Sequence, residues 1–538
     1  MKTATRTPNR SSMTLVISAV LAALLLAACG GKEEERITVP AGAQAGNLVG
    51  LESCTYEAED VEYAADCGTL VVLENRSDPN SRLIALPVIR IHSLDSNPTE
   101  PIFRLAGGPG ISNITGFSVV AWFIERHDIV FVGYRGMDGT VRLDCPEVVD
   151  VIRGGGQGDL LSDSSLDASS AAYARCAERL QSEGVDLAGY KVTDLIDDIE
   201  AARAGLGYER INLISSSFGT NVARIYAYMY PQSIYRSAMI AVDTPGATIH
   251  EADVVDELIQ AYDDQCKQDV ECSARTDDLA ETMRTVSHNM PERWLFININ
   301  PGLVKVATYN FFESTTDAPM IIDAWLAAAN GDPSGMAVLS LLGPNMFANA
   351  SVWGHNAALR ASLGEFDFAR DYRTELNPPD SIMGSPGSTA AFAEYSAWPT
   401  NIIAEEYREL QPSDVETLLV SGNIDFNTPV QFARDKLLPS LSNGQHVVLS
   451  NFGHGEFLGL QSEASRRLLA SFYDTDLADD SLFTYHPVDF HVGLGYPVMA
   501  KLAVGGGALV LCGLVVIFAF IVRRRRARLE GKISPKRG

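Results

Sequence analysis

Short apolar runs alternate with helical patterns along much of this chain. The apolar runs that predict buried strands are 83–92, 102–105, 128–132, 211–214, 238–242, 417–421 and 446–449. Between them, residues 192–206 repeat apolar positions with a helical period and carry acids on one face, and 221–230 form another helical pattern. This alternation predicts a mostly parallel sheet that is covered by helices on both faces.

A long interval interrupts the alternation. Well over a hundred residues separate the run 238–242 from the run 417–421, which is far more than a single crossover needs. Helical periods within this interval cover 252–266, 277–286 and 320–329. We therefore expect a separate, mostly helical lid inserted into the sheet domain.

The N-terminus has the pattern of an export signal. Three basic residues precede the apolar run 13–28, which closes on Ala27-Ala28-Cys29. This order resembles a bacterial lipoprotein signal, in which Cys29 is lipidated and becomes the mature N-terminus. The alternative is ordinary signal cleavage nearby, with Cys29 incidental.

The C-terminus has the pattern of a membrane span. Residues 502–522 are apolar and uncharged, and the four arginines 523–526 follow directly. Such a run is long enough to cross a bilayer, and basic residues mark its cytoplasmic side. A buried core helix is the alternative, but soluble helices seldom lack any polar face over that length. The main domain is therefore expected on the periplasmic or extracellular side of a bacterial cell membrane.

Cysteine usage agrees with export. Apart from Cys29 and Cys512, six cysteines remain, an even number that suits an oxidising compartment. Pairing of nearest neighbours is our working choice among the connectivities that six cysteines allow, and it gives Cys54 with Cys67, Cys145 with Cys176, and Cys266 with Cys272. Their spacing suggests no zinc site, and we expect no metal and no cofactor.

The charge balance excludes one class of partner. The formal net charge is -26, although the tail from Arg523 carries eight basic residues and one acid, so the rest of the chain is more acidic still. Such a surface repels nucleic acid. It favours solubility outside the membrane and does not identify a substrate.

The most informative local motif is Ser215-Ser216-Ser217-Phe218-Gly219. It lies between the apolar run 211–214 and the helical pattern 221–230. A strand, a sharp turn around a serine and a helix form the context of a nucleophile elbow, with small residues two positions either side. Ser217 is therefore the candidate nucleophile, although Ser215 stands where glycine is usual.

A base and an acid follow Ser217 in the order that this arrangement requires. Asp425 lies in the loop after the run 417–421, and His454 lies between two glycines after the run 446–449. Each has a simpler interpretation, because Asp425 suits a helix cap near Pro429 and His454 suits a surface loop. Together and in this order they favour a Ser-His-Asp triad.

A glycine-rich segment supplies candidate oxyanion donors. The apolar run 102–105 leads into Ala106-Gly107-Gly108-Pro109-Gly110. Backbone N–H groups near Gly107 and Gly108, with the N–H of Phe218, would stabilise a developing oxyanion. Without the elbow, an ordinary Gly-Pro turn would be the preferred interpretation.

Over about residues 50 to 475 the chain resembles the α/β-hydrolases of the prolyl iminopeptidase and tripeptidyl aminopeptidase-like type. The residues that carry the resemblance are 67–72 with Glu74-Asn75-Arg76, the glycine-rich 107–110, Tyr134-Arg135-Gly136, Ser217 with Gly219-Thr220, and the loops 422–429 and 453–455. Two departures stand out: Ala106 replaces the family's usual histidine, and Gly133-Tyr134 replace its frequent Asp-Gln. These departures leave substrate preference open.

The resemblance implies an α/β-hydrolase fold, a mostly parallel sheet with a large helical cap insertion that covers the active site. The expected parts are a signal peptide (1–28), a tether (29–49), the core (50–245 and 413–490), the cap (246–412), a transmembrane helix (502–522) and a basic cytoplasmic tail (523–538). Acids at the start of the cap, namely Glu251, Asp253, Asp256 and Glu257, are candidates for binding a peptide's N-terminal amine, although a solvated helix face is the simpler interpretation.

The function expected from this pattern is that of a membrane-anchored, exported serine hydrolase. By resemblance it is an aminopeptidase that releases N-terminal residues from short peptides through an acyl-enzyme. An esterase acting on small acyl esters is one alternative, because the same triad serves both. A catalytically inactive hydrolase fold used as a binding module is the other.

Overall fold

The structure is a computed structural model that describes residues 36–154, 159–247 and 249–506. Ile37–Pro497 form one compact unit, and the residues from Val498 onward belong to another. The predicted signal, Cys29, the basic tail and all but the first residues of the predicted span lie outside the described residues. Within the described ranges, no helix combines the length and apolar character that crossing a membrane requires.

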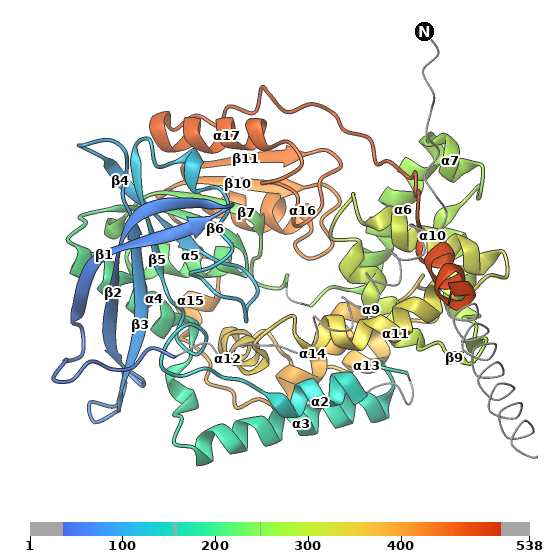
Figure 1. The fold of residues 1–538 in the computed structure, drawn as a ribbon, viewed down its shortest axis with the longest axis horizontal. Coiled ribbons are helices and arrows are strands. Elements are labelled where there is room, and N and C mark those ends of the chain that lie inside the picture. Colours follow the sequence, from blue (N-terminus) through green and yellow to red (C-terminus); the bar gives the residue numbers. More distant parts are fainter. Residues whose placement is uncertain (1–35, 155–158, 248, 507–538) are drawn as a thin grey trace, which may run out of the picture. The chain divides into compact units, whose positions relative to one another are not determined.

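One mixed sheet of nine strands organises the described part of the compact unit (Figure 1). In spatial order the strands are β1 (Leu48–Ala58), β2 (Val61–Leu73), β3 (Leu83–Ile91), β5 (His127–Val132), β4 (Thr99–Leu105), β6 (Ile211–Ser217), β7 (Ile234–Val242), β10 (Glu416–Gly422) and β11 (Gly444–Leu449). The first three pairings are antiparallel and the remaining five are parallel. The predicted mostly parallel sheet is therefore present, with an antiparallel edge.

Successive strand residues feed two apolar cores, one on each face of the sheet. In β6, Leu213 packs with α4 (Val192–Leu206) and α5 (Phe218–Met229), while its neighbour Ile214 packs with α17 (Ser462–Thr475) on the other face. This follows from the two-residue period of a strand. A sheet buried on both faces needs apolar residues at consecutive positions, which is why its strands read as continuous apolar runs.

Helices fill the interval between β7 and β10. They are α6 (Ala252–Gln268), α7 (Val270–Ser273), α8 (Leu279–His288), α9 (Pro301–Phe311), α10 (Ala318–Ala329), α11 (Ser334–Ala348), α12 (Trp353–Leu363), α13 (Tyr372–Glu375), α14 (Pro386–Ala397) and α15 (Glu405–Arg408). A short hairpin of β8 (Arg293–Trp294) and β9 (Ile297–Asn298) lies among them. We call residues 246–412 the cap, and its exact boundaries stay a prediction.

Two further helices join the cap from the first half of the chain. α2 (Pro146–Gly154) packs against α11, and α3 (Asp163–Ser182) packs against α14 (Figure 1). Both helices lie within residues 50–245, the predicted first part of the core, and that division of the chain stays a prediction. Their packing shows that the helical layer around the cap is built from two separate stretches of the chain.

The six cysteines of the compact unit form three disulfides. The pairs are Cys54–Cys67, Cys145–Cys176 and Cys266–Cys272. Nearest-neighbour pairing is thereby confirmed. The first joins β1 to β2, the second joins the start of the α2 region to α3, and the third joins α6 to α7.

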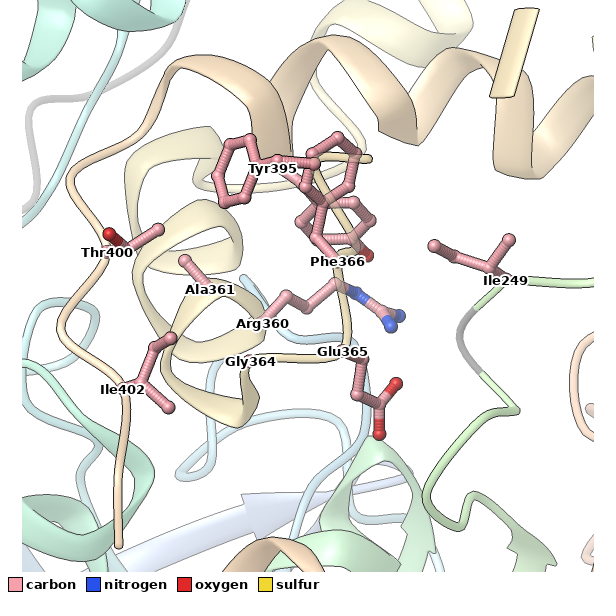
Figure 2. A pocket seen from close by; sticks show the side chains of 10 residues that line it. Ile249, Arg360, Ala361, Gly364, Glu365, Phe366, Tyr395, Thr400 and Ile402 are labelled. Carbon is pink, nitrogen blue, oxygen red and sulfur yellow. The ribbon is translucent and has the colours of Figure 1, made fainter. Parts of the chain in front are cut away.

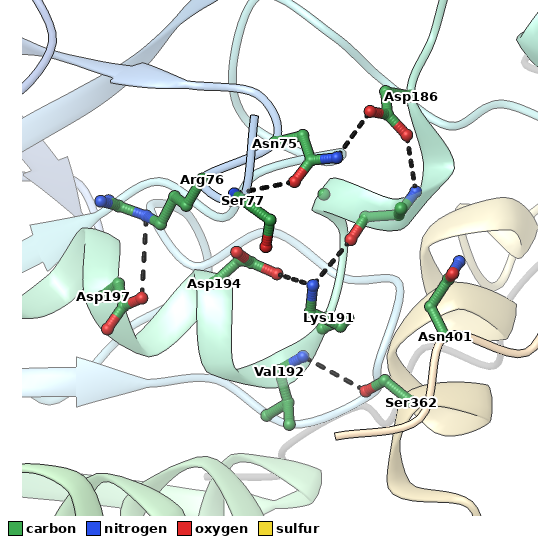
Figure 3. Close-up of polar contacts among 12 residues, drawn as sticks. Asn75, Arg76, Ser77, Asp186, Lys191, Val192, Asp194, Asp197, Ser362 and Asn401 are labelled. Atoms are coloured by element: carbon green, nitrogen blue, oxygen red, sulfur yellow. Dashed lines mark hydrogen bonds and ion pairs between the residues drawn. The ribbon is translucent and has the colours of Figure 1, made fainter. Parts of the chain in front are cut away.

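The motifs around Asn75 and Arg135, which carried part of the family resemblance, serve the architecture. The guanidinium of Arg135 is fully buried, donates to both carboxylate oxygens of Asp198 in α4, and donates to the carbonyl of Glu74. In the same region, the side-chain amide of Asn75 donates to the carboxylate of Asp186 (Figure 3). The backbone amide of Val192, at the start of α4, donates to the hydroxyl of Ser362 in the cap. This network joins the end of β2, α4 and the cap.

After α17 the chain runs from the sheet to the cap (Figure 1). Along this segment, His486 accepts a hydrogen bond from Asn451 through its carbonyl, and His491 pairs with Glu271 of α7. The segment ends at Pro497, whose carbonyl accepts from the hydroxyl of Ser334 at the start of α11. The cap is therefore held by connections at β7 and β10 and also by this C-terminal segment.

Candidate active site

Ser217 sits in a strained turn between β6 and α5. Its φ of 52° and ψ of -130° place a non-glycine residue in a sparsely populated region, as expected for a nucleophile elbow. Two positions later, a Cβ on Gly219 would lie 2.2 Å from the carbonyl oxygen of Leu105, so only glycine fits. The turn thus holds the hydroxyl at the carboxyl end of the parallel strands.

Ser215 occupies the position where glycine is usual, and the structure accommodates it. Its side chain is buried, and its hydroxyl donates to the carbonyl of Ala238 in β7 at 3.1 Å. The hydroxyl is therefore paired, so its burial leaves no orphaned polar atom. This departure from the family pattern leaves the elbow intact.

The structure brings Ser217, His454 and Asp425 together. Nε2 of His454 lies 2.9 Å from the Ser217 hydroxyl, and Nδ1 lies 3.0 Å from each Asp425 carboxylate oxygen. Asp425 is fully buried and accepts further bonds from the amides of Asn427 and Thr428. Those bonds close a loop before α16 (Val430–Phe432), whose own N-cap is Pro429 without a side-chain cap bond. Asp425 therefore does not cap that helix, and its geometry suits the orientation of His454.

The ion pair between His454 and Asp425 favours the charged imidazole. Burial by itself would lower the pKa of His454, but the Asp425 carboxylate and its hydrogen bond, with Glu313 and Asp243 further away, raise this pKa to about 9. Burial likewise opposes the ionised form of Asp425. His454 and Thr428 outweigh burial there, so the pKa of Asp425 lies below its usual value. The site is thus arranged to stabilise the imidazolium that forms when Ser217 loses its proton.

Gly107 lies against the elbow, and Gly108 lines the same cavity as Ser217. A Cβ on Gly107 would approach within 2.8 Å of the Ser217 Cβ. Gly108 adopts a φ of +102°, which residues other than glycine rarely adopt. Phe218 is the first residue of α5, where amides have no partner within the helix. The three predicted oxyanion positions therefore surround the nucleophile, and the helix N-terminus adds a favourable dipole.

Helix α12 of the cap holds the loop that contains Gly108. Nη2 of Arg360 donates to the Gly108 carbonyl at 3.2 Å, and Asn356 donates to the Pro109 carbonyl at 3.0 Å. The Gly110 amide donates to Nδ1 of His355 at 3.1 Å. The cap thus fixes the shape of the loop.

The two departures from the family pattern meet at this loop. The Tyr134 hydroxyl donates to the carbonyl of Ala106 at 3.3 Å, and the ring of Tyr134 stacks on His355. Burial lowers the pKa of His355 to about 3, so its imidazole is neutral and accepts the Gly110 N–H. An aromatic pair that joins the core to the cap therefore packs beside the position where the family has its histidine.

A pocket of about 340 Å³ opens beside Ser217. Its apolar wall includes Tyr173 of α3, Phe347 of α11 and Trp353 of α12. Its charged lining consists of Asp243, Glu313, Arg360 and Glu394. The volume suits a small ligand, and the walls are contributed by both the core and the cap.

Like Asp243, Glu394 of α14 has a buried carboxylate oxygen that finds no hydrogen-bond partner among the described residues. In Glu394 this atom is Oε1, and the residue is only 5% exposed. Burial raises the pKa of Glu394 to about 8, against the opposing effect of Arg360. Burial also raises the pKa of Glu313, next to the loop of His454. Carboxyl groups held in this way are ready to pair with a cation from a ligand.

Arg360 lines the pocket beside Ser217 and also a second hollow of about 20 Å³, which Figure 2 shows. In this view its guanidinium lies near Glu365, and Phe366 and Tyr395 lie on the opposite side. Burial by itself would lower the pKa of Arg360, but Tyr395, Asp243, Glu394 and Glu365 raise it above its usual value. Arg360 also lies over the Phe218 ring at 5.6 Å, so one fixed cation faces both halves of the candidate oxyanion hole.

The acids proposed from sequence for amine binding are not part of this pocket. None of Glu251, Asp253, Asp256 and Glu257 lines it. Glu251 pairs instead with Arg370, and Asp256 accepts from the Ile382 amide. Glu313, Glu394 and Arg360 were missed, because no local motif marks them and only the packing of the cap brings them to Ser217. Among the described residues, no group of three or more His, Cys, Asp or Glu side chains is arranged to hold a metal ion.

Comparison with known families assigns the class. Residues 153–293 match the alpha/beta hydrolase fold family, so the chain is an α/β-hydrolase. Residues 386–480, which contain Asp425 and His454, match the TAP-like protein family. Together these matches support an α/β-hydrolase of the TAP-like family, as the sequence resemblance predicted.

Individual relatives are distant. The tripeptidyl aminopeptidases of Streptomyces lividans and Streptomyces coelicolor are each 24% identical over 197 residues, which cover 33% of this chain and 35% of the relative. The match thus spans about a third of the length of these curated relatives. Among solved structures, an esterase from Exiguobacterium antarcticum is 14% identical, with coverage of 74% of this chain and 98% of that chain and a TM-score of 0.34. A serine hydrolase from Cycloclasticus zankles is 11% identical, with coverage of 80% and 100% and a TM-score of 0.35.

Proposed function

We propose that this hydrolase is a serine aminopeptidase that releases N-terminal residues from short peptides. Ser217 attacks the scissile carbonyl, its proton passes to Nε2 of His454, and Asp425 orients the imidazole. The amides near Gly107, Gly108 and Phe218 hold the oxyanion. When the C–N bond breaks, His454 returns the proton to the departing amine. A water molecule then repeats the cycle on the acyl-enzyme and releases Ser217.

The buried carboxyl of Glu394 is the observation that favours a substrate with a free amine. An unpaired carboxyl group inside a pocket gains a partner when an ammonium group enters, and Glu313 lines the same pocket. Binding of the cation stabilises the ionised form of Glu394 and so reverses the effect of burial on its pKa. The two Streptomyces relatives are named tripeptidyl aminopeptidases, which agrees with this assignment.

Paired substrates test this assignment. We expect Glu394→Gln to raise KM for peptidyl amides with a free N-terminus by about 10- to 100-fold, because a charged hydrogen-bonded contact is lost. Turnover of N-acetylated peptides and of simple esters should change little. Glu251→Gln is the matched control, because Glu251 pairs with Arg370 outside the pocket. Equal effects on free and acetylated substrates would refute the role of Glu394 in amine binding.

The two alternatives give different outcomes in the same screen. An esterase would turn over small acyl esters and no peptidyl amide, with or without a free amine. An inactive binding module would turn over neither substrate class. The aminopeptidase proposal requires cleavage of unblocked peptidyl amides.

We also propose that the protein is exported and held in the cell membrane, with its catalytic domain on the periplasmic or extracellular side. The sequence supports this through the signal pattern that ends at Cys29 and the uncharged run 502–522. The three disulfides suit an oxidising compartment. Protease treatment of intact spheroplasts tests the proposal: the catalytic domain should be degraded while a cytoplasmic marker survives, and protection of the domain would contradict it.

A further inference from the structure

The tip of the β8–β9 hairpin exposes two large apolar side chains. Leu295 and Phe296 form its two-residue loop and are 56% and 84% exposed. Leu295 has a φ of 52°, which glycine or asparagine adopts readily in such loops and a branched apolar residue does not. Neither turn propensity nor core packing explains these two residues, which points to an external contact.

Helix α11 continues this apolar surface. It packs against both strands of the hairpin and exposes Leu341, Leu342 and Met346, which are 60%, 48% and 50% accessible. The sequence of α11 contains no charged residue, although the whole chain has a net charge of -26. We call Leu295, Phe296, Leu341, Leu342 and Met346 the apolar surface.

The course of the chain indicates what covers this surface. The compact unit ends at Pro497, whose carbonyl accepts from Ser334 at the start of α11 and whose ring lies against Gly335. The uncharged run begins five residues later, at Leu502. Even a fully extended chain covers only about 18 Å over five residues. If the run 502–522 crosses a bilayer, the N-terminal end of α11 must therefore lie close to the membrane surface.

We propose that the apolar surface docks into the interface of the bilayer that residues 502–522 cross. This inference rests on the membrane anchorage proposed above. The surface is apolar and α11 is uncharged, so the contact depends on burial of apolar side chains at the headgroup boundary rather than on attraction to anionic lipids. Because Phe347 of α11 lines the pocket beside Ser217, docking would fix one wall of that pocket at the membrane.

Tryptophan reporters in reconstituted full-length protein test the contact. Phe296→Trp places the hairpin reporter at the tip, and Leu94→Trp is the control reporter because Leu94 is 75% exposed in the β3–β4 loop of the core. Vesicles of phosphatidylcholine with or without brominated acyl chains are compared, and the wild-type emission is subtracted. We expect the emission of the hairpin reporter to fall about two-fold or more in brominated vesicles, and the emission of the control reporter to stay unchanged.

Flotation of the same vesicles separates the possible failures. If the protein floats with the vesicles and the hairpin reporter is quenched no more than the control reporter, the docking is refuted while the anchorage stands. If the protein does not float, both are refuted. If the emission of the hairpin reporter shifts to the blue without lipid quenching and the protein cross-links as a dimer, a second copy covers the surface and the docking is refuted.

A variant that suits the turn distinguishes contact from folding. Leu295→Gly with Phe296→Asn gives the loop residues that two-residue hairpins favour and removes the strain at position 295. We expect an equal or higher thermal midpoint, unchanged ester hydrolysis in detergent and weaker lipid quenching of a Met346→Trp reporter. A lower midpoint would show that the two apolar residues serve folding, and undiminished quenching would show that they do not contact lipid. Either result would overturn the proposal.

Discussion

Replacement of Asp425 by asparagine should move the pH dependence of the reaction and lower its maximal rate. Asp425→Asn keeps the size of the side chain but removes the charge that lies 3.0 Å from Nδ1 of His454. Asp425 is fully buried, so solvent does not replace that charge. The change therefore acts on the protonation of His454 and on the orientation of its ring.

The size of the effect follows from the raised pKa of His454. The difference between an ordinary imidazole pKa near 6.5 and the value of about 9 corresponds to about 3 kcal/mol in favour of the imidazolium. Without the carboxylate, burial dominates and takes the pKa of His454 below 6.5. The maximal rate should also fall by about 10³- to 10⁴-fold, because the imidazolium of the transition state loses its partner and its orienting bond.

The assay is kcat/KM against pH for an uncharged p-nitrophenyl ester, since this substrate has no amine that titrates. His454 must be neutral to accept the proton, so the wild-type rate should rise with pH with a midpoint at about 9. In Asp425→Asn the midpoint of the rise should lie below pH 6.5, and the plateau should be much lower. Circular dichroism confirms that the variant is folded. An unchanged midpoint of the rise would refute the assignment of this titration to His454 and Asp425.

The same ion pair predicts a change in stability with pH. The folded pKa of His454 lies above its unfolded value, so the imidazolium stabilises the fold below about pH 6.5. This contribution is lost as the pH rises from about 6.5 to about 9. Urea unfolding of the wild type and of Asp425→Asn should therefore differ most near pH 6, and the difference should shrink toward pH 9. A difference that grows with pH would contradict the sign of this linkage.

Three further substitutions test individual contacts. Ser215→Gly removes the bond to the Ala238 carbonyl and adds backbone freedom, so the free energy of unfolding in urea should fall by about 1 to 2 kcal/mol while kcat/KM stays nearly unchanged. A large loss of rate would show that Ser215 acts in the reaction. Gly453→Ala places a Cβ 2.1 Å from the Glu313 carbonyl and should lower the free energy of unfolding by about 1 to 3 kcal/mol. Gly455→Ala, on the other side of His454, meets nothing within 4 Å and should change it by no more than about 0.5 kcal/mol. Equal effects would contradict the described packing of the loop. Arg360→Met removes the bond to the Gly108 carbonyl and should lower kcat by about 10- to 100-fold. The control Arg434→Met, at an exposed site, should leave kcat unchanged. An unchanged kcat in Arg360→Met would show that Arg360 does not position the oxyanion loop.

The sheet and the order of the triad residues were accessible from sequence because both depend on local patterns. Strands buried on both faces require continuous apolar runs, as at 211–214, and β6 forms there. The elbow and the loops of Asp425 and His454 each follow such a run. A parallel sheet places the carboxyl ends of its strands at one edge, so residues far apart in sequence were expected to meet.

The charged lining of the pocket was not accessible in this way. Glu394 and Arg360 lie in the last turns of cap helices α14 and α12, where their neighbours give no sign of a pocket. Their role depends on how the cap packs over Ser217. The contribution of α3 is hidden for the same reason, because its sequence position suggests the core while its packing partner is α14.

Ser215 shows a third kind of limit. The sequence reveals the departure from glycine but cannot tell whether the elbow tolerates it. The answer depends on the Ala238 carbonyl in the neighbouring strand, which is in reach of the hydroxyl. Sheet pairing between β6 and β7 therefore decides a question that the motif itself leaves open.

The central claim is that Ser217 is a nucleophile activated by His454. A fluorophosphonate probe tests this most directly, because it reacts covalently only with an activated serine. Folded wild-type protein should bind one probe per chain, lose ester hydrolysis in proportion, and carry the probe on Ser217 in a peptide map, while Ser217→Ala should bind none. Absence of labelling in the folded wild type, or equal labelling of Ser217→Ala, would contradict the claim.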